Sequence, residues 1–162
     1  MNSPFRQWRF LHFAIFSCLL FVVLHIFFVK LPPCGNHVWR QSNTLAIAKN
    51  FHQENMNILL PRIDKRYDHT GVTGTNFPLY EWSLAAVYRV FGFHHFWHRL
   101  FALLISLLSF FLVYYFFKER GEVTGRVAAW AFLFNPLVFY YGFSGMPDVL
   151  SIAFAMVAKV GI

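Results

Sequence analysis

Residues 100–117 read LFALLISLLSFFLVYYFF and contain no Lys, Arg, Asp or Glu. Two other stretches, 10–29 and 127–147, are also free of charged residues. A transmembrane helix needs ~20 mainly apolar residues to cross a hydrocarbon core of ~30 Å, so all three stretches have a suitable length. A fourth apolar stretch starts after Asp148 and reaches only Ala158 before Lys159. That is about half of a crossing.

The composition supports burial in lipid. Hydrophobic residues make up 57% of the 162 residues and charged residues 13%, against roughly 25% charged in soluble domains. We predict an all-α integral membrane protein with three full transmembrane helices, over about 10–31, 98–117 and 126–143, and a partial fourth over about 148–160. A large loop, about 32–97, separates the first two. We expect the chain to end inside a helix that a longer protein would complete.

The first apolar stretch has the alternative of a signal peptide. Its length exceeds the usual 7–15 apolar residues, and no small-x-small cleavage site follows it. An uncleaved anchor is therefore favoured. The net charge of +7 is scattered between the apolar stretches and forms no basic run. This pattern fits loops bordering anionic lipid headgroups and argues against nucleic-acid binding.

Short loops enriched in Lys and Arg stay cytoplasmic. Arg6 and Arg9 precede the first stretch, and Lys118, Arg120 and Arg126 lie between the second and third. We therefore expect a multi-pass protein of the cell (inner) membrane, with a cytoplasmic N-terminus and an external, periplasmic loop 32–97. Long loops cross largely regardless of their charge, so the basic residues inside this loop do not contradict the assignment.

Two segments of the loop are predicted to be juxtamembrane helices. Residues 36–54 contain no Gly or Pro, and Thr44, Ile47, Ala48 and Phe51 recur at helical spacing. This amphipathic pattern suits a helix lying in the membrane interface. A second helix is expected from about Pro78 to residue 91. The polar stretch 61–74 between them is the best place for a site.

Acidic side chains there are candidates for a general base. Asp64 or Asp68 is a candidate base or ligand of a divalent metal ion, although a solvated ion-pair cluster with neighbouring cations is the simpler interpretation of Asp64. Asp148 opens the fourth apolar stretch, where a carboxylate can cap a helix or act at the membrane boundary. Glu81 with Arg89 is interpreted as a structural pair.

Cations of the same loop can bind a phosphate. Arg40, beside Trp39, can bind one bidentately or anchor the chain at the interface. The other candidates are Arg62, Lys65 and Arg66. His94, His95 and His98 have no carboxylate or cysteine nearby, so interface anchoring is favoured over a metal site.

Eight motifs in a fixed order resemble one family. They are HVWRQ (37–41), AIAKNF (46–51), NILLPRID (57–64), GTNFPLY (74–80), RVFG (89–92), RL (99–100), NPL (135–137) and MPD (146–148). The order resembles the N-terminal portion of a GT-C glycosyltransferase, of the dolichyl-phosphate-mannose-protein mannosyltransferase-like branch related to the lipid A aminoarabinose transferases.

The resemblance implies a membrane enzyme that transfers a sugar from a polyprenyl-phosphate carrier to a lipid, glycan or protein. Many relatives carry an Asp-Glu pair in the first loop helix, where this chain has Arg40-Gln41, and an acid where it has Asn76. We expect a truncated portion that is inactive by itself. The alternative from another class is a small non-catalytic membrane protein, a transporter or an assembly subunit. The apolar stretches hold no ionisable residue beyond histidine at mid-span, which argues against transport.

Overall fold

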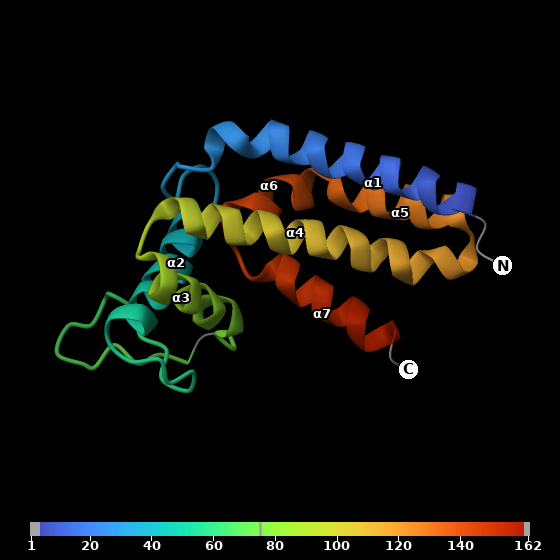
Figure 1. Cartoon of the computed structure of the whole chain (residues 1–162). Helices are drawn as coiled ribbons and strands as arrows, with labels where there is room; N and C mark the ends of the chain where they lie inside the picture. Colours follow the sequence, from blue (N-terminus) through green and yellow to red (C-terminus); the bar gives the residue numbers. More distant parts are fainter. Residues whose placement is uncertain (1–3, 75, 161–162) are drawn as a thin grey trace. The chain divides into compact units, whose positions relative to one another are not determined.

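The computed structural model describes residues 4–74 and 76–160. Within them the sole β-pairing is an isolated bridge between Arg62 and Val72, so the predicted all-α class is confirmed. Thr75 of the GTNFPLY motif and the side chains of Arg6 and Lys159 lie outside the described parts. The element order is α1 (Pro4–His25), η1 (Ile26–Phe28), α2 (Val38–Gln53), α3 (Leu79–Phe91), α4 (His95–Phe117), η2 (Lys118–Arg120), α5 (Glu122–Leu133), α6 (Pro136–Ser144) and α7 (Asp148–Val160), as Figure 1 shows.

Two helical stretches of the described residues are long and apolar enough to cross a membrane. Trp8–Phe28 combines most of α1 with η1, and His95–Arg120 combines α4 with η2. They overlap the spans predicted over 10–31 and 98–117. Their length and composition are consistent with a membrane protein.

The span predicted over 126–143 is wrong as one continuous helix. α5 ends at Leu133 and α6 begins at Pro136. Proline lacks an amide hydrogen and clashes with the preceding turn, so a helix does not continue through it. Asn135 instead caps α6, because its Oδ1 accepts a hydrogen bond from the Leu137 amide at 3.0 Å.

The chain divides into two compact units. The long-helix unit comprises the described parts of Met1–Phe28, Leu103–Phe143 and Asp148–Ile162. The loop unit comprises the described parts of Val29–Ala102 together with Ser144–Pro147. α4 contributes residues to both units.

Aromatic and small residues hold the long-helix unit together, in which α1 and α5 lie side by side (Figure 1). The rings of Phe10 and Tyr114 stack with their centroids 3.8 Å apart. The Ser106 hydroxyl donates a hydrogen bond to the Gly142 carbonyl oxygen at 2.9 Å. A Cβ at Gly142 would lie 2.5 Å from that hydroxyl oxygen, so glycine permits the close approach of α4 and α6.

In the loop unit, α2 packs against α3. Ile47 and Phe51 of α2 form a buried cluster with Ala85 of α3. Trp82 packs against this cluster, and its indole N–H donates to the Met56 carbonyl oxygen at 2.8 Å. The apolar face predicted for the first loop helix is therefore buried, but it packs on α3, because α3 offers an apolar face of its own.

Candidate functional site

The irregular segment between α2 and α3 folds back on itself. The Ile63 amide donates to the Gly71 carbonyl oxygen, and the Thr73 amide donates to the Pro61 carbonyl oxygen, both at 3.0 Å. Gly71 has a φ of +76°, and a Cβ there would lie 2.8 Å from the Ile63 carbonyl oxygen. Glycine is thus needed at this turn for two separate reasons.

Two of the predicted phosphate-binding cations share one glutamate. Arg62 donates from Nη1 to Glu54 Oε2 at 2.7 Å, and Arg66 donates from Nη2 to Glu54 Oε1. These hydrogen bonds, first that of Arg66 and then that of Arg62, lower the pKa of the Glu54 carboxyl. We call Glu54, Arg62 and Arg66 the exposed ion-pair cluster, since their side chains are 27–32% accessible to solvent.

An ion-pair cluster was the simpler interpretation for Asp64, but the acid that forms the ion pairs with Arg62 and Arg66 is Glu54, and Asp64 acts on Arg66 only through its charge. Asp64 Oδ1 accepts a hydrogen bond from the Asn50 side-chain amide at 3.0 Å. The same amide nitrogen donates to the Arg62 carbonyl oxygen at 2.9 Å. Asn50 therefore fixes the start of the segment to α2. Glu54 was missed because it lies at the end of a helix, outside the charged stretch.

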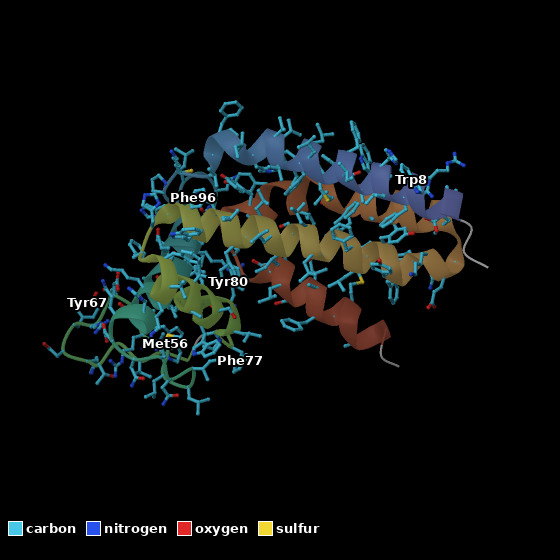
Figure 2. All side chains as sticks on the ribbon, in the orientation of Figure 1. Trp8, Met56, Tyr67, Phe77, Tyr80 and Phe96 are labelled. Atoms are coloured by element: carbon cyan, nitrogen blue, oxygen red, sulfur yellow. The ribbon has the colours of Figure 1, made fainter. Side chains whose placement is uncertain are left out.

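Asp68 and Lys65 lie at the exposed end of the segment. The Lys65 ammonium lies 5.3 Å from the centroid of the Tyr67 ring, and Tyr67, labelled in Figure 2, is 81% exposed. Within the described residues no three His, Cys, Asp or Glu side chains lie close enough together to hold a metal ion. Asp64 and Asp68 thus lie in the same segment, but the described residues around them do not form a metal centre.

A second acid lies buried between α2 and α3. Glu81, in the first turn of α3, is 6% exposed. Its carboxylate accepts hydrogen bonds from its own backbone amide and from the Thr44 hydroxyl, and the positive charge of Arg40 has a smaller effect on it. Burial is the main influence and raises the pKa of the Glu81 carboxyl. We call Arg40, Thr44 and Glu81 the buried acid cluster.

The pairing predicted between Glu81 and Arg89 is wrong. Arg89 is exposed, whereas Glu81 points toward α2. Eight residues separate them, which is more than two helical turns and too far for the usual contacts between side chains one turn apart. Sequence spacing within α3 gave no sign of partners that come from another helix.

Buried polar contacts fix the chain around the start of α2. Arg99, 3% exposed, donates to the Pro32 carbonyl oxygen at 2.8 Å and to Gln41 Oε1 at 3.4 Å. Gln41 donates to the carbonyl oxygens of Cys34 and Asn36 at 3.0 and 3.1 Å. Gln41 and Arg99 therefore fix the turn that leads into α2. Gln41 directly follows Arg40 in this helix.

Asp148 is the first residue of α7 and belongs to the long-helix unit. A carboxylate in the first turn of a helix interacts favourably with the helix dipole, as the capping interpretation requires. The other candidate acids belong to the loop unit. The motifs also lead us to predict that Asp148 converges with Asp64 or Asp68 on one cavity at the outer membrane surface, and this stays a prediction.

The loop unit also contains a hollow of about 520 Å³. Its lining is mainly apolar and includes Phe77, which is 68% exposed and labelled in Figure 2. The side chains and backbone that line it belong to Ile58, Leu59, Pro61, Val72, Thr73, Gly74, Asn76, Phe77 and Pro78. The charge pattern of the sequence gave no indication of this hollow.

The comparisons with known proteins bear on the resemblance found in the motifs. No curated protein and no solved structure matches the chain. The profile of the family described as dolichyl-phosphate-mannose-protein mannosyltransferase matches residues 68–160, which is more than half of the chain. The match begins at Asp68 and includes all the helices from α3 to α7, with Asp148 as the first residue of α7. The resemblance is thereby confirmed, and the chain belongs to the dolichyl-phosphate-mannose-protein mannosyltransferase family.

Proposed function

We propose that the chain belongs to a membrane glycosyltransferase of GT-C type that transfers a sugar from a polyprenyl-phosphate carrier to a hydroxyl group of a lipid, glycan or protein. The observation that carries this proposal is the family match over residues 68–160. It favours an enzyme over a non-catalytic subunit or a transporter, because the matched family is named for sugar transfer.

The reaction needs an acid–base group and cations. A carboxylate takes the proton of the acceptor hydroxyl while the hydroxyl oxygen attacks the anomeric carbon of the sugar. The bond between that carbon and the phosphate oxygen breaks, and polyprenyl phosphate leaves with the electron pair. We assign the base to Asp148, with Asp64 and Asp68 as the other candidates. Asp148 and Asp68 lie within the matched stretch.

The departing phosphate gains negative charge, which nearby cations stabilise. The candidates are Arg40, Arg62, Lys65 and Arg66. Glu54 already accepts hydrogen bonds from Arg62 and Arg66, so a phosphate has to share or replace this carboxylate. Lys65 is exposed and Arg40 is half-buried beside Glu81. Lys65 and Arg40 thus differ from Arg62 and Arg66, which form ion pairs with Glu54. The contributions of these two sets of cations to phosphate binding can therefore be tested separately.

The proposed orientation places loop 32–97 on the external face of the cell membrane and residues 118–126 in the cytoplasm. The short basic connection between α4 and α5, with Lys118, Arg120 and Arg126, supports it. A carrier lipid embedded in the membrane would then present its phosphate at the level of the loop unit.

Donor binding by the full chain in lipid vesicles tests the function. The probe is radiolabelled polyprenyl-phosphate-mannose, displaced by either polyprenyl phosphate or polyprenol. We expect saturable binding that polyprenyl phosphate displaces and polyprenol does not, because the cations recognise the phosphate. Equal displacement by both lipids, or no saturable binding, contradicts the proposal.

A further inference from the structure

The corner between α3 and α4 is short and has a defined backbone geometry. Only Gly92, Phe93 and His94 connect the two helices. The Gly92 amide donates to the Tyr88 carbonyl oxygen at 2.9 Å, and its φ of +80° lies in the region that favours glycine. At the start of α4, the Phe96 amide donates to His94 Nδ1 at 3.1 Å. The end of α3 therefore stays close to the first turn of α4.

This corner exposes apolar side chains next to a candidate membrane span. Val90 is 74% exposed and Phe91 is 59% exposed, although both belong to α3. The Phe91 ring stacks on the Trp97 ring, with the two centroids 4.4 Å apart. Trp97 lies in the first turn of α4, which belongs to the candidate span His95–Arg120. A bilayer crossed by α4 would therefore meet Val90 and Phe91 at its surface.

The charges around the corner are positive. Residues 82–102 contain Arg89 and Arg99 but no Asp or Glu. Arg99 is buried, whereas Arg89 is exposed. From α2, the Lys49 ammonium lies 5.9 Å from the centroid of the Phe93 ring. Within the described parts of the chain neither Arg89 nor Lys49 forms an ion pair, so both charges are available to an anionic partner.

The polar segment between α2 and α3 has a different charge balance. From residue 54 to residue 68 three acids offset three cations, namely Glu54, Asp64 and Asp68 against Arg62, Lys65 and Arg66. Tyr67 of this segment and Phe96 of the corner are labelled in Figure 2 and lie well apart. An extended anionic surface is therefore attracted more strongly to the corner than to the polar segment.

We propose that the α3–α4 corner, formed by Lys49, Arg89, Val90, Phe91 and Phe93, binds anionic phospholipids of the surrounding bilayer. Val90 and Phe91 enter the boundary between headgroups and acyl chains, where the burial of apolar surface is favourable. Arg89 and Lys49 then meet the headgroup phosphates, since long basic side chains extend along an apolar surface toward polar groups. The ligand is the bilayer lipid and not the sugar donor, so the inference does not depend on the proposed reaction.

The experiment uses the full chain in phosphatidylcholine vesicles, with a fluorophore attached to Val90→Cys in a background of Cys18→Ser and Cys34→Ser. The probes are phosphatidylglycerol and phosphatidylcholine that carry a nitroxide quencher on an acyl chain, each added at the same small fraction. Stronger quenching by the phosphatidylglycerol probe measures its enrichment at the corner. Tyr67→Cys carries the same fluorophore as the matched control, since Tyr67 is 81% exposed in the polar segment.

We expect the phosphatidylglycerol probe to quench the fluorophore at position 90 more strongly, and ~1 M salt to remove this preference. Arg89→Gln and Lys49→Gln should each reduce the preference by up to about fivefold, the usual contribution of one basic side chain near an anionic membrane. Lys65→Gln is the charge control and should leave the preference unchanged, because Lys65 is exposed in the polar segment. The fluorophore at position 67 should be quenched weakly and equally by both lipids.

Three results overturn the inference while leaving the proposed sugar transfer standing, because donor binding is measured separately. They are equal quenching by both lipids at position 90, a preference that survives both Arg89→Gln and Lys49→Gln, and equally strong quenching at positions 67 and 90. A second label on Phe91→Cys, at a residue 59% exposed, guards against a local effect of the fluorophore at position 90. The absence of a preference for phosphatidylglycerol at this position also overturns the inference.

Discussion

The exposed ion-pair cluster and the buried acid cluster each combine a glutamate with arginine, but water reaches the two glutamates to different extents. The Glu54 side chain is 28% exposed, and its two arginines lower the pKa of its carboxyl. Glu81 is 6% exposed, and burial raises the pKa of its carboxyl in spite of Arg40. Arginine therefore favours the ionised acid in both places, but at Glu81 the cost of burial outweighs this effect.

This difference bears on how much each cluster contributes to the free energy of folding. An exposed ion pair contributes little to the free energy of folding, and its groups lose little hydration. A buried carboxylate opposes folding at neutral pH unless its partners compensate fully. The exposed ion-pair cluster should therefore contribute little to stability, and Glu81 should reduce it at neutral pH. The predictions below test this comparison, beginning with the largest effect.

Membrane labelling tests whether the loop unit, which contains both clusters, lies on the external side of the membrane. Single cysteines at Thr70 and Glu119, both exposed, are placed in a background with Cys18 and Cys34 changed to Ser. We expect an all-or-none difference with a membrane-impermeant thiol reagent in intact cells. Thr70→Cys should react, and Glu119→Cys should react only after lysis. Reaction of both in intact cells would refute the proposed orientation.

Asp148 belongs to neither cluster, and its loss should have the largest effect on catalysis. In an assay of the proposed sugar transfer, Asp148→Asn should reduce the rate about 100- to 10,000-fold, the usual contribution of general base catalysis. Asp64→Asn and Asp68→Asn are measured in parallel, and a comparable loss in one of them identifies the second acid. Unchanged transfer by Asp148→Asn, with normal membrane insertion, would leave Asp148 as a helix cap alone.

The packing between α2 and α3, which brings the residues of the buried acid cluster together, should contribute strongly to the free energy of unfolding. Phe51 is 1% exposed and packs with Ala85 across this contact. Phe51→Ala should lower the free energy of unfolding by about 3–5 kcal/mol. Phe77→Ala, at a residue 68% exposed, should change it by less than about 0.5 kcal/mol. Urea unfolding in detergent micelles measures both, and equal effects would contradict the packing described for the loop unit.

The sequence predicted mainly those features that depend on residues close together in the chain. The helices near 36–54 and 78–91 were predictable because their apolar spacing and the flanking Pro78 and Gly92 are local signals. The division of 126–143 was missed, although Asn135-Pro136 is a local signal for a new helix. The apolar run continues on both sides of this proline, so hydropathy alone predicts one uninterrupted helix.

The sites divide in the same way. The charges between Arg62 and Asp68 are adjacent in sequence, so the segment was recognised. The buried acid cluster joins residues 40, 44 and 81, and only the packing of α2 on α3 brings them together. No spacing rule within one helix connects Glu81 to Arg40. Asp148 lies in the other unit, and its role stays a prediction.

The two glutamates should respond to pH with opposite signs. For Glu81 the pKa in the folded state lies above that of the unfolded chain, so folding is favoured while the group is protonated and loses stability as pH rises through the folded pKa. Glu81→Gln should therefore stabilise the fold at pH 7–8. Below about pH 4 the difference should vanish. The Tm measured against pH tests this, and a lower Tm for Glu81→Gln at pH 8 would show that its ionised form is fully compensated.

Glu54 should give the smallest effect and the opposite sign. Its folded pKa lies below that of the unfolded chain, so its contribution is present above the unfolded pKa near 4.3 and is lost as pH falls through the folded pKa. Because its side chain is 28% exposed, solvent screens both ion pairs, and Glu54→Gln should cost only about 0.2–1 kcal/mol at pH 7. The loss should shrink in ~1 M salt, where the Debye length is ~3 Å. Glu119→Gln is the control for removal of an exposed acid. A cost that persists at high salt, or one larger than that of Phe51→Ala, would mean that Glu54 is held as tightly as Glu81 and would remove the distinction between the two clusters.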